Sequence, residues 1–123
     1  EERLKKDFRY LIKQRGGMLA KGRLLGLQFD TLFTDNLYFE ISRHAIEMAM
    51  KLKKALQDKG YRFYSESPSN QQFVILDNAK LAELEKEVQL SHWCKVDDTH
   101  TAVRFCTSWA TPEENIDRVI AML

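Results

Sequence analysis

The sequence has 123 residues, a length that suits one domain and is too short for two independent cores. Its 19 Lys and Arg residues nearly balance its 18 Asp and Glu residues, and the net charge of +1 excludes a strongly basic nucleic-acid binder. With 44% apolar residues the chain is not intrinsically disordered, and no apolar run approaches the ~18 residues of a membrane span. Residue 1 is Glu rather than Met, so we expect a processed chain or a piece of a longer one.

The first third of the chain is expected to be helical. Apolar residues recur at helical spacing over residues 1–13, and Gly16 and Gly17 then interrupt the pattern, because glycine costs a helix about 1 kcal/mol relative to alanine. Helical periodicity resumes over residues 18–33. This stretch is apolar on more than one side, which predicts that it packs between other elements.

A long amphipathic helix is predicted over residues 37–59. Thr34, Asp35 and Asn36 break the chain before it and offer capping side chains, and Gly60 ends it as a left-handed C-terminal residue would. One apolar stripe runs along this helix and comprises Tyr38, Ile41, Ala45, Met48, Leu52 and Ala55.

Strand signals dominate the second half of the chain. Strands are predicted at 61–64 and 73–76, and the second is so apolar that we expect both of its faces to be covered. Asp77 and Asn78 should cap a short helix, and residues 90–96 and 101–107 should form an antiparallel hairpin. Thr111, followed by Pro112 and two glutamates, predicts the start of a final helix.

The order of elements predicts an α+β fold. We expect a small, mostly antiparallel sheet of about four strands, with helices packed on one side and a long helical lead-in before it. Residues 1–35 would form the lead-in, and residues 36–123 would form an αββαββα core. Together they make a single domain.

Arg104 is the most informative candidate for a binding residue. It lies in the middle of an apolar predicted strand, between Val103 and Phe105. A charge in such a place needs a partner, and the planar guanidinium suits a carboxylate or a phosphate. That partner is either an acidic residue of this domain or the carboxylate of a substrate.

A second cluster of candidates consists of basic residues around the glycine pair, namely Lys13, Arg15, Lys21 and Arg23. Cations beside a flexible Gly-Gly segment are compatible with a phosphate, and a solvated basic face is the alternative. The three histidines share no ligand spacing, and no metal site is expected.

Cys94 and Cys106 are interpreted as buried free thiols in strands, which is typical of a cytoplasmic protein, rather than as a disulfide. Trp93 and Trp109 could anchor a contact, but core packing is the usual role of tryptophan.

Three stretches resemble one enzyme family. They read DFRYLIKQRGGMLAKGRLLG at 7–26, SPSNQQFVIL at 67–76 and VRFCTSWAT at 103–111. Together they resemble the small C-terminal domain of the threonine aldolase and β-eliminating lyase family, which are fold-type I enzymes that depend on pyridoxal phosphate. The third stretch is the most specific, because the family has an Arg in this strand followed by a Thr. Leu19 departs from the family pattern, in which an Arg follows the Gly-Met pair.

The resemblance implies roles for individual residues. Arg104 would bind the α-carboxylate of an amino-acid substrate. Lys21, with Arg15 and Lys13, would help to hold the phosphate of the cofactor. The lysine that forms the Schiff base would lie in a large domain before residue 1, so no catalytic residue is expected in this chain.

The resemblance also implies an activity for the longer protein, which is a cytoplasmic lyase of amino-acid metabolism. It would cleave β-hydroxy amino acids to glycine and an aldehyde. The partner of the present domain would be the large domain of the same protein, and the whole protein would be a homo-oligomer. The 123 residues alone are expected neither to bind pyridoxal phosphate stably nor to turn over substrate. The alternatives are β-elimination or transamination on the same scaffold, or a non-catalytic domain that binds a small molecule.

Overall fold

The computed structural model describes all of residues 1–123, which form two compact units, residues 1–38 and residues 39–123. The first unit contains α1 (Glu2–Lys5), α2 (Phe8–Gln14), α3 (Arg23–Phe33) and the short 3-10 helix η1 (Thr34–Asn36). The helix expected over residues 1–13 is broken at Asp7, whose φ of 60° is left-handed. Residues 18–22 are not helical, so α3 begins later than the periodicity predicted.

The first unit has no buried side chain. Leu24 and Phe29 of α3 are 76% and 64% exposed, which contradicts the expectation that this stretch packs between other elements of the chain. Its aromatic rings contact one another instead. The ring of Phe33 stacks on those of Phe29 and Tyr38, with centroids 6.3 Å and 5.2 Å apart.

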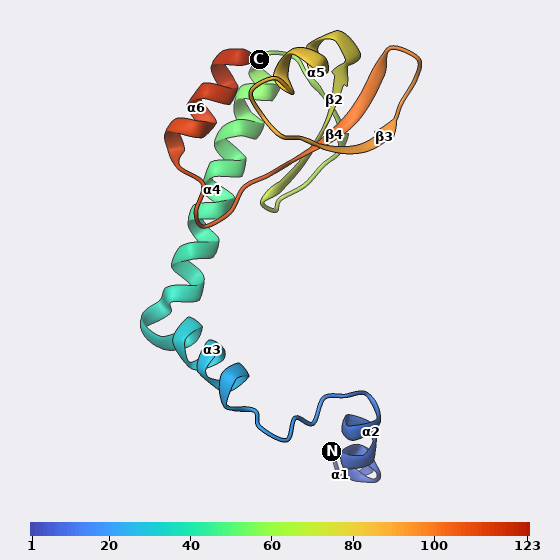
Figure 1. The fold of residues 1–123 in the computed structure, drawn as a ribbon, viewed down its shortest axis with the longest axis vertical. Helices are drawn as coiled ribbons and strands as arrows, with labels where there is room; N and C mark the ends of the chain where they lie inside the picture. The colour runs from blue at the N-terminus through green and yellow to red at the C-terminus, as the bar shows by residue number, and fades with distance from the viewer. The chain divides into compact units, whose positions relative to one another are not determined.

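The second unit carries the sheet (Figure 1). The elements are α4 (Leu37–Asp58), which begins just before the unit boundary, then β1 (Arg62–Ser65), β2 (Gln71–Asp77), α5 (Asn78–Leu84), β3 (Ser91–Lys95), β4 (His100–Cys106) and α6 (Glu113–Met122). The four strands lie in the order β1-β2-β4-β3 and all pair antiparallel. The predicted α+β fold is confirmed. None of the helices has the length and apolar character needed to cross a bilayer.

The core lies on one face of this sheet. Side chains along β2 and β4 point alternately to the two faces of the sheet. Val74 and Val103, which pair across the two strands, are both fully buried on the core face. Helices α4, α5 and α6 cover it and contribute apolar side chains to one cluster. The most buried members of this cluster are Leu52, Leu56, Val74, Leu76, Leu84 and Val103.

The opposite face of the sheet, called the open face below, has no helix packed on it. Its residues in the two central strands are Gln71, Phe73, Ile75, Ala102, Arg104 and Cys106, which alternate with the core residues. Phe73 and Ile75 are only half-buried, so the expectation that this strand is covered on both faces is wrong. A sheet with one covered face therefore leaves Arg104 on the side away from the core.

Local signals for the helix ends were partly correct. Gly60 adopts a φ of 81°, and the N–H of Tyr61 donates to the carbonyl of Leu56 at 3.0 Å, as in a Schellman motif. Asp77 caps α5, because its side chain accepts the N–H of Ala79 at 2.8 Å. Thr111 does not cap α6, since its hydroxyl accepts the N–H of Ser108 and the helix begins at Glu113.

Candidate functional site

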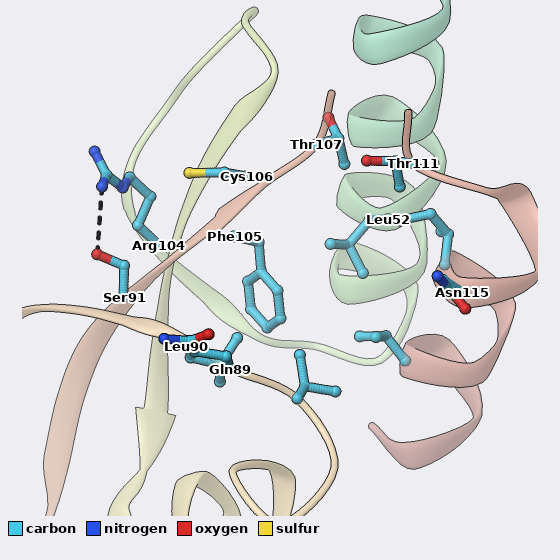
Figure 2. Close-up of a pocket in the computed structure, with 13 residues that line it drawn as sticks. Leu52, Gln89, Leu90, Ser91, Arg104, Phe105, Cys106, Thr107, Thr111 and Asn115 are labelled. Carbon is cyan, nitrogen blue, oxygen red and sulfur yellow. Dashed lines mark hydrogen bonds between the residues drawn. The ribbon is translucent and has the colours of Figure 1, made fainter. Parts of the chain in front are cut away.

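Arg104 lies near the end of β4, which is flanked by β2 on one side and β3 on the other. Its Cα pairs with that of Phe73 on β2 and with that of Ser91 on β3. Figure 2 shows the side chains of Arg104 and Cys106 on the side of the strand opposite that of Phe105. The guanidinium is therefore a feature of the open face and not of the core.

The partners of the guanidinium are neutral. Nη1 donates to Oε1 of Gln71 and Nη2 donates to Oγ of Ser91, both at 3.3 Å, and Nε is buried without any hydrogen-bond partner. No carboxylate of this chain forms an ion pair with Arg104, so of the two partners considered the acidic residue within this domain is not found. A half-buried cation without a counter-charge can still form charge-assisted hydrogen bonds with an anion.

Trp93 stands beside this cation. The guanidinium carbon lies 5.8 Å from the centroid of the indole, within range of a cation–π interaction. The ring of Phe73 meets the indole edge-on, with centroids 4.9 Å apart. Trp93 is nevertheless 51% exposed and Trp109 is 69% exposed. The interpretation that these tryptophans pack in the core is therefore wrong for both.

A β-bulge accounts for the position of Trp93. His92 pairs with Val103 and Cys94 pairs with Ala102, so Trp93 has no residue opposite it on β4. The extra residue lets Trp93 and Cys94 both face the open side.

Both cysteines are free, as predicted. Cys94 lies in β3 and Cys106 lies in β4, which also agrees with the sequence. The prediction that they are buried is wrong, because Cys94 is half-buried and Cys106 is exposed on the open face. The residues contain no group of His, Cys, Asp and Glu that could hold a metal ion.

The basic residues predicted to meet a phosphate belong to the first unit, whereas Arg104 belongs to the second. Lys13 lies in the last turn of α2, and Arg15 and Lys21 lie between α2 and α3. All three are exposed, and none forms an ion pair. The N–H groups of Gly16 and Gly17 donate to the carbonyls of Lys13 and Ile12. Any anion here would therefore meet charged side chains rather than a backbone cradle.

A cavity of about 240 Å³ lies between β4, α6 and the segment before β3, and its lining includes Arg104 and Ser91. Figure 2 shows Phe105, Leu52 and Asn115 around it, while the guanidinium of Arg104 points away from them. Its walls are mostly apolar. The cavity thus borders Arg104 and Ser91, although the guanidinium itself is directed away from its apolar wall.

The sequence pointed to Arg104 but not to Gln71 or Ser91, and Trp93 was considered as a contact residue but interpreted as core. Ser91 and Trp93 lie in the predicted strand 90–96, whereas Gln71 lies before the predicted strand 73–76, and which strand lies beside which was not predictable. Alternation within 71–76 could have placed Gln71 on the face of Phe73, and this is the one signal that was available.

The fold and the site define an α+β domain with an arginine that has no acidic partner on the open face of its sheet. Over 96% of its length the chain is similar to the threonine aldolase of Leishmania major, with 44% sequence identity and a TM-score of 0.87. The chain spans 34% of the length of that protein. No protein-family model and no curated protein matches the sequence. The resemblance to threonine aldolase predicted from the three sequence stretches is confirmed.

Proposed function

We propose that this chain is the C-terminal part of a pyridoxal-phosphate-dependent aldolase that cleaves β-hydroxy amino acids to glycine and an aldehyde. The similarity to a threonine aldolase supports this function at the level of sequence and fold. The observation that carries it is the state of Arg104, whose buried Nε lacks a partner and whose charge meets no carboxylate.

In the proposed reaction Arg104 binds the α-carboxylate of the amino acid. Its two terminal nitrogens each carry two N–H bonds, and each uses one of them on a neutral protein partner. One N–H on each nitrogen is left for the two oxygens of a carboxylate. Such a two-point contact fixes the orientation of the substrate, which determines the bond that is presented for cleavage.

The basic residues of the first unit would contribute to holding the cofactor. Lys21, Arg15 and Lys13 are exposed cations without acidic partners, which fits the dianionic phosphate of pyridoxal phosphate. When bound, this cofactor supplies an electron sink for the carbanion that cleavage leaves behind. The residues that bind its ring would belong to the large domain of the longer protein, which we propose to be a cytoplasmic, fold-type I homo-oligomer.

The test is Arg104→Lys in the full-length enzyme. Lysine keeps the charge but lacks the planar fork, so substrate binding should weaken by about 1.5–3 kcal/mol, roughly a 10- to 150-fold rise in KM for L-threonine. Arg62→Lys is the matched control, because Arg62 is an exposed arginine of the edge strand β1, which β2 separates from the strand of Arg104. An unchanged KM for Arg104→Lys would show that Arg104 has only a structural role. Activity of the wild-type full-length enzyme against a panel of β-hydroxy amino acids would define the substrate side chain that the enzyme prefers.

A further inference from the structure

We propose that Gln71 is a positioning residue of the carboxylate site, which orients the guanidinium of Arg104 without neutralising it. This inference rests on the proposed function of Arg104. The inference is that the uncharged side chain of residue 71 matters for substrate binding. It starts from the hydrogen bond that Nη1 of Arg104 donates to Oε1 of Gln71.

The guanidinium is oriented from both neighbouring strands. Gln71 belongs to β2 and Ser91 belongs to β3, and they accept from different terminal nitrogens of Arg104. A planar group held at two of its corners cannot rotate freely, so its remaining N–H bonds have defined directions. Trp93 further limits the side chain by flanking the guanidinium at 5.8 Å.

All three of these neighbours are uncharged. An amide and a hydroxyl accept hydrogen bonds through dipoles, and an indole attracts a cation through its ring quadrupole. None of them supplies a counter-charge, so the positive charge of Arg104 stays available to an incoming carboxylate. A glutamate at position 71 would have nearly the same size and reach as glutamine, but it would form an internal ion pair with Arg104 and repel the carboxylate of the substrate.

The experiment compares Gln71→Glu with wild type in the full-length enzyme, using L-threonine as substrate. We expect KM to rise by about 10-fold or more, since a like charge now faces the substrate carboxylate. The value of kcat at saturating threonine should change less than about 2-fold, because a defect confined to binding is overcome by substrate.

Two further variants separate charge from shape. Gln89→Glu is the matched control, because Gln89 is an exposed glutamine that Figure 2 places on the cavity side, away from the guanidinium; it should keep the KM of wild type. Gln71→Met removes the hydrogen bond without adding a charge, so its KM should rise by less than that of Gln71→Glu.

A KM for Gln71→Glu equal to that of wild type would overturn the proposal. Equal losses of kcat in Gln71→Glu and Gln71→Met, accompanied by a lower melting temperature in both, would also overturn it, because Gln71 would then be a structural residue only. These outcomes are distinct from failure of the proposed function. That failure requires an unchanged KM in Arg104→Lys, whereas this inference fails alone if Arg104→Lys is impaired and Gln71→Glu is not.

Discussion

The hydroxyl of Thr107 donates a hydrogen bond of 2.6 Å to the carbonyl of Ala45, joining the segment after β4 to the middle of α4. The backbone N–H of Thr107 also donates to the carbonyl of Asn70, and its own carbonyl accepts from the Asn70 side chain at 2.7 Å. One buried residue thus connects the end of β4, the start of β2 and a helix. These segments adjoin Gln71 at the start of β2 and its register partner Cys106 at the end of β4.

Thr107→Val should lower the free energy of unfolding by about 1–3 kcal/mol, because it keeps the shape of the side chain but removes a buried hydrogen bond. Chemical denaturation of the 123-residue chain measures this change. Thr107→Ser retains the hydroxyl and should lose less stability than the valine variant. Equal losses in both variants would contradict the importance of the bond to Ala45.

Leu56→Ala should destabilise the chain by about 2–5 kcal/mol, because Leu56 is fully buried and its removal leaves a cavity between α4 and the sheet. Ile46→Ala is the control on the same helix, since Ile46 is 41% exposed. A comparable loss in the two variants, measured by denaturant titration, would argue against the core described above.

The turn between β3 and β4 should weaken in acid. Two hydrogen bonds hold the pKa of Asp97 below its ordinary value of 3.8. The larger effect comes from the ring of His100 and the smaller one from the N–H of Thr99. Because the folded state binds this proton less readily than the unfolded state, the stabilisation is complete above that ordinary value. It is lost as the pH falls through the folded pKa.

Asp97→Asn should therefore lose less stability than wild type between about pH 4 and pH 2, as measured by thermal unfolding at each pH. Asp98→Asn serves as the control, because Asp98 is the next residue and its carboxylate forms only an exposed ion pair with Lys95, which contributes little to stability. A wild-type slope in Asp97→Asn would mean that the turn does not depend on this carboxylate.

The second unit should fold without most of the first. Every buried apolar residue lies between Ala45 and Ile116, and none lies in residues 1–38. A chain of residues 37–123 should therefore retain cooperative thermal unfolding, with a midpoint within about 5 °C of that of the full 123 residues, since unfolding enthalpy follows buried surface. A non-cooperative melt of the shorter chain would refute this expectation.

The two thiols should differ in reactivity. Cys106 is exposed and Cys94 is half-buried, so a thiol reagent should modify the first faster than the second under native conditions. Cys106→Ser should abolish the fast phase and leave the slow one. Loss of the slow phase instead would reverse this assignment.

The sequence predicted the elements whose signals are local. The end of α4 at Gly60 and the capping of α5 by Asp77 each depend on residues within one helical turn, and both predictions are confirmed. Thr111 shows the limit of such signals, because its hydroxyl is taken by Ser108 in the preceding turn rather than by α6.

The carboxylate site could be predicted only in part. Arg104 was identified because a charge in an apolar strand needs a partner, which is a property of one strand alone. Its partners Gln71 and Ser91 lie 33 and 13 residues away in the sequence, on strands whose pairing the sequence pattern does not specify. The bulge at Trp93 depends on the same pairing, which is why the aromatic neighbour was assigned to the core.

That bulge makes residue 93 a removable insertion. In the observed register Ser91 pairs with Arg104 and Cys94 pairs with Ala102, and both face the open side. Only His92 would lie between them if residue 93 were left out, so β3 would keep the two-residue alternation of a regular strand. Deleting Trp93 would thus take away the indole beside Arg104 while every other side chain of β3 stays on its own face. Loss or gain of one codon can therefore change the wall of this site without shifting the rest of the hairpin.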